Sequence, residues 1–120
     1  RDLRMSRGLG DVYKRQLENV MAGAEPEVCH IVDKPTFGSY MLPSEILDEL
    51  MAHNKAVEDI EKIVIYGYCT DICVISNAMV LRAAFPETEI EVLSDCCAGV
   101  TPQSHQTALD AMRACQFTII

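Results

Sequence analysis

The chain has 120 residues, so it forms at most one domain, and 49% of its residues are hydrophobic, which is typical of a folded protein. Its net charge of −8 excludes a nucleic-acid-binding protein, because nucleic acid demands a basic surface. No apolar run approaches the roughly 18 residues that a membrane helix needs, and no secretory signal opens the sequence. We therefore expect a soluble protein without a membrane partner.

Residues 1–16 differ in composition from the rest of the chain. They hold half of the Lys and Arg residues and show neither helical nor strand periodicity. We expect them to be a non-native or disordered tail, and residues 17–120 to be the C-terminal part of a single domain.

From residue 28 onward, apolar runs alternate with helical patterns. In chain order we expect a strand at Val28–Asp33, a helix at Pro43–Asn54, a strand at Lys62–Gly67, a helix at Asp71–Ala84, a strand at Ile90–Asp95, a helix capped by Thr101 with Pro102 at its first position, and a strand from Gln116 to Ile120. This alternation predicts an α/β domain with a parallel sheet. The strand at Lys62–Gly67 is almost continuously apolar, which predicts burial on both of its faces. Four strands are few for such a sheet, so we expect a domain truncated at its N-terminus.

The six cysteines lie mostly within or beside apolar strands and helices. Cysteine in such places is usually a small buried hydrophobic residue of a reducing compartment, so we expect free thiols and a cytoplasmic protein. A zinc site is disfavoured, because Cys96, Cys97, His105 and Cys115 match no usual ligand spacing.

The segment IVIYGYCTDICVISNA, residues 63–78, places a tight turn at Gly67 between a strand and a helix. Ligands bind at the carboxyl ends of parallel strands, and a helix start offers unpaired N–H groups and partial positive charge. Cys73 lies in the first helical turn, where these features favour a thiolate that can attack a carbonyl. The spacing leaves an alternative open, in which Thr70 and Asp71 cap the helix and Cys73 is a packed small residue.

Three segments together resemble the cysteine-hydrolase branch of the isochorismatase-like superfamily, which includes nicotinamidases. They are VDKPTFGS at 32–39, GYCTDICV at 67–74 and SDCCAGVTPQSHQTALDAM at 94–112. The resemblance spans roughly residues 28–120. It implies a three-layer α/β/α fold with a parallel sheet of Rossmann-like topology.

The resemblance also assigns roles to individual residues. The family works through an Asp–Lys–Cys triad, in which Cys73 matches the nucleophile and Lys34 the lysine. Without the resemblance, Lys34 would be interpreted as a solvated charge. A cis peptide bond is implied between Tyr68 and Cys69, with the N–H groups of Cys69 and Cys73 forming the oxyanion hole. Because the superfamily's isochorismatases lack the nucleophilic cysteine, the resemblance implies amide hydrolysis through a thioester.

Two parts of the family's site have no counterpart here. Asp11 follows no strand and Asp33 adjoins the lysine itself, so neither matches the triad's aspartate. No Asp with two His precedes Lys34, so we expect no metal in this chain, while the resemblance allows a divalent metal such as zinc in the full-length enzyme. The chain alone should therefore be inactive. His105 shares the core-facing positions of its helix, which predicts a hydrogen-bonded structural histidine.

The resulting hypothesis is a thiol-dependent hydrolase of a small-molecule amide. Nicotinamide, converted to nicotinate and ammonia in NAD salvage, is the leading substrate, and the full-length protein is expected to be a homo-oligomer. One alternative is another amidase of the superfamily, acting on an N-carbamoyl or ureido substrate. A second alternative is a non-catalytic member that serves as a binding or assembly subunit.

Overall fold

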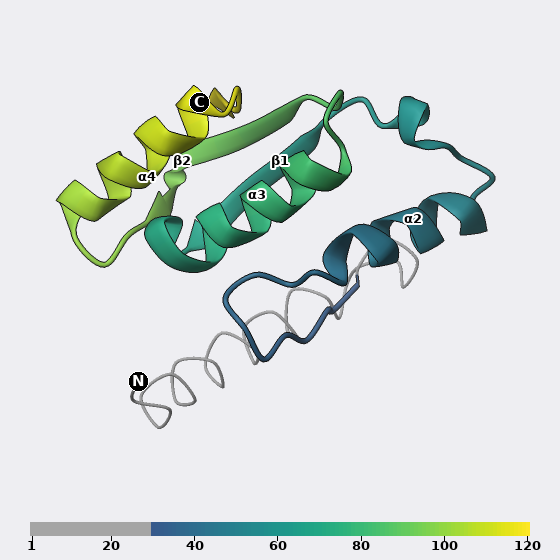
Figure 1. Ribbon diagram of the computed structural model, residues 1–120, viewed down its shortest axis with the longest axis horizontal. Coiled ribbons are helices and arrows are strands. Elements are labelled where there is room, and N and C mark those ends of the chain that lie inside the picture. Colours follow the sequence, from purple (N-terminus) through teal and green to yellow (C-terminus); the bar gives the residue numbers. More distant parts are fainter. Residues whose placement is uncertain (1–29) are drawn as a thin grey trace. The chain divides into compact units, whose positions relative to one another are not determined.

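The computed structural model describes residues 30–120, and residues 33–120 form one compact unit. This unit has a parallel sheet in the order β1-β2-β3, which confirms the predicted α/β class. The strands are β1 (Ile63–Tyr68), β2 (Ile90–Ala98) and β3 (Thr118–Ile119). The helices are α2 (Leu42–Ala52), α3 (Ile75–Ala84) and α4 (Pro102–Ala114) (Figure 1). A 3-10 turn lies at Val57–Asp59 and a π-helical turn at Thr70–Val74. None of the described helices is both long and apolar enough to cross a membrane.

The core lies between one face of the sheet and the helices α3 and α4 (Figure 1). Its fully buried members include Ile90 and Val92 of β2 and Met112 of α4, each 0% exposed. Burial of such side chains is the main favourable contribution to folding, at about 25 cal/mol per Å² of apolar surface. The remaining buried core residues come from the π-helical turn, from α3 and α4, and from the residues that follow these two helices: Val74, Ala78, Leu81, Phe85, Ala108, Leu109 and Phe117.

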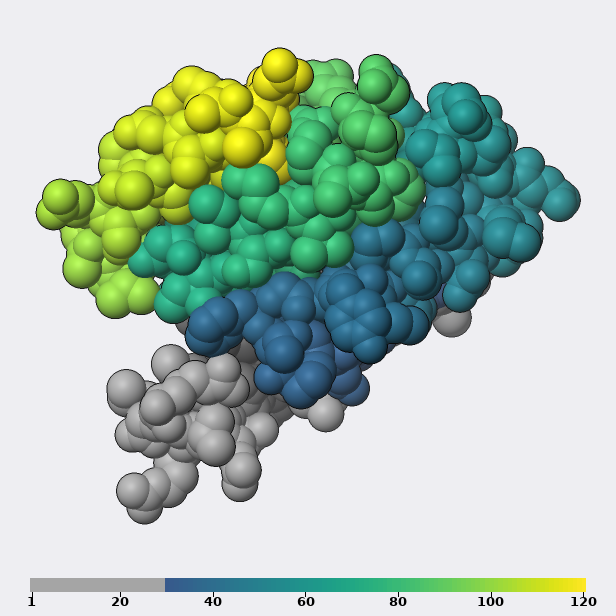
Figure 2. Space-filling view, viewed as in Figure 1, coloured from purple at the N-terminus to yellow at the C-terminus, as the bar shows by residue number. Residues whose placement is uncertain are grey.

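The other face of β1 is open to solvent within the described part of the chain. Val64, Tyr66 and Tyr68 are 41%, 64% and 59% exposed, whereas Ile63 and Ile65 pack partly against the core. The prediction that this strand is buried on both faces is therefore wrong for residues 30–120. Among these residues α3 and α4 lie side by side (Figure 2) and pack over the face of the sheet opposite Val64, Tyr66 and Tyr68.

Two further predictions need correction. Residues 30–34 form neither helix nor strand, so the described part of the predicted strand Val28–Asp33 is wrong. A β-rich run forms a strand only where a neighbouring strand supplies the partners for its backbone hydrogen bonds, and the run itself does not determine this. Residues 28 and 29 and the predicted tail at 1–16 lie outside the described residues. The five described cysteines are free, as expected, but none is buried, because they lie at the ends of strands and helices.

The start of α4 agrees with its predicted cap. The Oγ1 atom of Thr101 accepts a hydrogen bond from the Ser104 N–H at 3.0 Å, and the Ser104 Oγ accepts one from the Thr101 N–H at 3.1 Å. Pro102 occupies the first position, where a missing N–H costs nothing. This capping box fixes the loop between β2 and α4, which borders the site described next.

Candidate active site

The carboxyl end of β1 leaves the regular sheet pairing. Ile65 lies opposite Val92 but Gly67 lies opposite Cys97, so the facing stretch of β2 is bulged. Gly67 has a φ of 132°, a conformation that residues with a Cβ rarely adopt. The peptide bond between Tyr68 and Cys69 is cis. The Cys69 N–H thus belongs to a cis peptide unit directly before the helix.

Cys73 lies in the first turn after the strand. Residues Thr70–Val74 form a π-helical turn, which is wider than an α-helical one and continues directly into α3. The Cys69 carbonyl caps this turn by accepting hydrogen bonds from the N–H groups of Ile72 at 3.1 Å and Val74 at 3.0 Å. The sequence placed Cys73 in the first turn of a helix, and the structure has it there, half-buried.

Lys34 contacts Cys73 across 39 positions of sequence. Its Nζ donates a hydrogen bond to the Cys73 Sγ at 3.5 Å and another to the Thr36 carbonyl at 2.9 Å. The lysine side chain is exposed, and it reaches the thiol from the loop that precedes α2. The two side chains that the resemblance named as nucleophile and lysine therefore lie together.

The first turns of α4, with the loop between β2 and α4, hold the turn that carries Cys73. Thr70 is 0% exposed, and its hydroxyl is hydrogen-bonded to the Nδ1 of His105 at 2.7 Å. Gly99 makes room for this contact, since a Cβ there would lie 2.8 Å from the His105 Cβ and 2.9 Å from its Cα. The predicted role of His105 as a hydrogen-bonded structural residue is confirmed.

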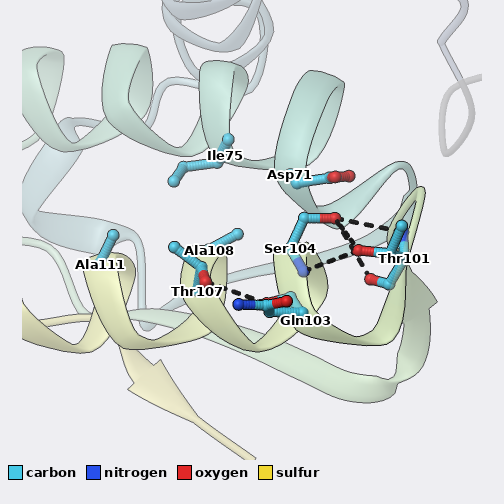
Figure 3. Close-up of a pocket in the computed structure, with 8 residues that line it drawn as sticks. All are labelled: Asp71, Ile75, Thr101, Gln103, Ser104, Thr107, Ala108 and Ala111. Atoms are coloured by element: carbon cyan, nitrogen blue, oxygen red, sulfur yellow. Dashed lines mark hydrogen bonds between the residues drawn. The ribbon is translucent and has the colours of Figure 1, made fainter.

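Asp71 is bound to the same loop. Its carboxylate accepts hydrogen bonds from the Val100 N–H at 3.2 and 3.3 Å. The Ser104 side chain, backbone N–H groups and the nearby His105 hold the pKa of Asp71 below its ordinary value, against the opposing effect of partial burial. Asp71 and Ser104 line a groove of about 510 Å³ between this turn and α4. Figure 3 shows their side chains next to each other. This carboxylate stabilises the turn and its loop.

The cysteines near Cys73 are in environments that favour the neutral thiol. Burial raises the pKa of Cys69, and the nearby Asp71 and Cys73 raise it further. Burial also raises the pKa of Cys97, although a hydrogen bond with the Gly67 backbone partly offsets this effect. Both thiols should be poor nucleophiles, because the thiolate is the reactive form.

Sequence reasoning did not single out Asn77. Its side-chain amide donates a hydrogen bond to the Cys73 carbonyl at 3.0 Å and accepts one from the Ser39 N–H at 2.8 Å. The spacing of four residues from Cys73 on a predicted helix was the available signal, since such residues are neighbours on a helix surface. The bond to Ser39, in contrast, depends on tertiary packing.

No group of three His, Cys, Asp or Glu side chains among residues 30–120 is arranged to hold a metal ion. A divalent metal in the full-length enzyme stays a prediction, as does the aspartate of the triad.

The family model of the isochorismatase domain matches residues 5–120. The chain belongs to the isochorismatase domain family. The match includes most of the segment at 1–16 that its composition set apart, so the boundary at residue 17 stays a prediction. The comparison with curated proteins found no match.

Solved structures share the fold of this isochorismatase-family chain. The nicotinamidase SaPncA from Staphylococcus aureus is 23% identical with a TM-score of 0.62, and the alignment covers 88% of this chain and 62% of that one. The nicotinamidase/pyrazinamidase PncA from Bacillus subtilis is 19% identical with a TM-score of 0.64, covering 87% of this chain and 52% of that one. YcaC from Pseudomonas aeruginosa is 18% identical with a TM-score of 0.61, covering 88% and 46%. The chain thus spans about half to three-fifths of the length of these proteins, and the likeness shows the fold.

Proposed function

We propose that this chain carries the nucleophile and the lysine of a thiol-dependent hydrolase that acts on small carboxamides. The observation that carries the proposal is the contact of 3.5 Å between the Lys34 Nζ and the Cys73 Sγ. It lies at the carboxyl end of a parallel strand and at a helix start, where α/β proteins bind ligands and where anions are stabilised.

In the proposed reaction the Cys73 thiolate attacks the amide carbonyl and forms a carbon–sulfur bond. The carbonyl oxygen becomes an oxyanion, for which the N–H groups of Cys69 and Cys73 are the proposed donors. The intermediate expels the amine as ammonia after the amine gains a proton, which leaves a thioester. Water then attacks the thioester, releases the carboxylate and returns the thiol. Lys34 balances the negative charge on sulfur before the attack and again when the carbon–sulfur bond of the thioester breaks.

The substrate proposal is nicotinamide, converted to nicotinate and ammonia. Nicotinamidases from two bacteria share the fold, and YcaC from Pseudomonas aeruginosa, which shares it too, has been solved with a covalent acrylamide. These likenesses support a small carboxamide as the class. We place the proton-transferring aspartate, and a divalent metal such as zinc if one binds, in the part of the domain that this chain does not span. A cytoplasmic homo-oligomer that serves NAD salvage completes the proposal.

The test measures ammonia release from nicotinamide, pyrazinamide and N-carbamoyl or ureido compounds by the gene product that includes the upstream coding sequence. Cys73→Ala should lower kcat at least about 1,000-fold, as loss of a covalent nucleophile does. Cys115→Ser, a change at an exposed thiol, is the control and should leave kcat unchanged. Full activity of Cys73→Ala would refute the assigned nucleophile. Absence of ammonia release from every amide would favour a non-catalytic member of the family.

A further inference from the structure

The side-chain amide of Asn77 joins the nucleophile turn to the loop that carries Lys34. Its Oδ1 accepts a hydrogen bond from the Ser39 N–H at 2.8 Å. Its Nδ2 donates to the Cys73 carbonyl at 3.0 Å and to the Phe37 carbonyl at 3.4 Å. The acceptor oxygen of the Asn77 amide thus pairs with one backbone N–H, and its NH2 group pairs with two backbone carbonyls. Among side chains, only an amide offers an acceptor and two donors in this arrangement.

The loop is also packed closely against the helix beside Asn77. A Cβ at Gly38 would lie 3.1 Å from the Ser76 Cβ and 3.2 Å from the Ser76 backbone, so the loop backbone approaches α3 as closely as a glycine allows. Ser39, the next residue, is buried at 8% exposed. The loop therefore has a defined position on α3 that depends on both Gly38 and Asn77.

Hydrogen bonds continue from this anchored segment to the lysine ammonium. The Thr36 hydroxyl donates to the Gly38 carbonyl at 2.6 Å, and the Thr36 carbonyl accepts from the Lys34 Nζ at 2.9 Å. An exposed lysine side chain ordinarily samples many rotamers. Its ammonium therefore stays beside one particular atom, such as the Cys73 Sγ, only where a second partner in a fixed position also binds it. The Thr36 carbonyl supplies that fixed partner.

We propose that Asn77 is a positioning residue that holds the Lys34 ammonium against the Cys73 sulfur by tying the loop at 36–39 to the nucleophile turn. The catalytic meaning of this role rests on the proposed function. The placement itself concerns only residues of this chain and can be measured without any substrate.

The test is competitive alkylation of the gene product that includes the upstream coding sequence by limiting iodoacetamide, with peptide mass spectrometry to measure the ratio of labelling at Cys73 to labelling at Cys115. Asn77→Ala should lower this ratio about two- to fivefold, the range expected when an exposed ion pair is lost, and Lys34→Met should lower it equally. Gly38→Ala, which displaces the same loop while Asn77 is intact, should act in the same direction. Thr107→Ala, which removes an exposed hydrogen bond to the backbone of α4, is the control and should leave the ratio unchanged.

A double variant separates positioning from loss of structure. If Asn77 acts through Lys34, adding Asn77→Ala to Lys34→Met should change the ratio no further, and the pH profiles of both single variants between about pH 6 and 9 should superimpose. A mere loosening of the fold would instead raise labelling at Cys69 and Cys97 together with Cys73. An unchanged ratio in Asn77→Ala, or an equal loss when Lys34 is already methionine, would overturn the proposal. Failure of amide hydrolysis would refute the proposed function alone, because this assay measures alkylation at sulfur and not the hydrolysis of an amide.

Discussion

Replacing Thr70 by valine tests how much the contact with His105 stabilises the turn that carries Cys73. Valine has the shape of threonine, so the substitution opens no cavity at this fully buried position. It removes the hydroxyl that is hydrogen-bonded to the His105 Nδ1 at 2.7 Å. Leaving one partner of a buried hydrogen bond unsatisfied costs about 1–3 kcal/mol. Because His105 is half-buried and water can reach part of it, we expect a loss of about 1–2 kcal/mol in the free energy of unfolding.

Urea unfolding followed by circular dichroism measures this loss. With a slope of about 2 kcal/mol per molar urea, the midpoint should fall by roughly 0.5–1 M. Thr107→Val is the matched control, since it makes the same change at an exposed position of α4, and it should lie within about 0.5 kcal/mol of the unchanged chain.

A double-mutant cycle with His105→Leu isolates the contribution of the contact. The loss caused by Thr70→Val should shrink by about 1 kcal/mol when His105 is absent, because the hydrogen bond is already gone. Equal midpoints for Thr70→Val and Thr107→Val would show that the hydrogen bond does not stabilise the turn. An undiminished loss in the His105→Leu background would assign the effect to another contact.

Two further predictions concern the same loop. Gly99→Ala should destabilise the chain by about 1–3 kcal/mol, because its Cβ would meet the Cα and backbone N of His105 at 2.9 Å, and a urea midpoint equal to that of the unchanged chain would contradict this. Asp71→Asn should lower stability at neutral pH but not in strong acid, because a carboxylate whose pKa is lowered on folding stabilises the fold above its unfolded pKa of about 3.9 and loses this effect as the pH falls through the folded value. Thermal melts of both proteins across that pH range measure the difference, and a gap that widened in acid would refute the sign.

The local pattern of the sequence determined the α/β class and the position of Cys73. Apolar runs of strand length, helical stripes and the Thr101–Pro102 start are visible without tertiary structure, because each depends on residues close together in the chain. The assignment of Lys34 came from the resemblance alone, since an exposed lysine beside a polar loop carries no distinguishing local signal.

Only the tertiary structure decided which side chains meet. The contact of 3.5 Å between the Lys34 Nζ and the Cys73 Sγ joins residues that are 39 positions apart in the chain. It depends on the packing of the loop at 36–39 against α3, in which Asn77 and Gly38 take part. The one-sided burial of β1 was likewise invisible in the sequence. The apolar residues of a strand show that both of its faces could be buried, but whether they are buried depends on which other elements pack against them. Within residues 30–120, helices cover one face of β1.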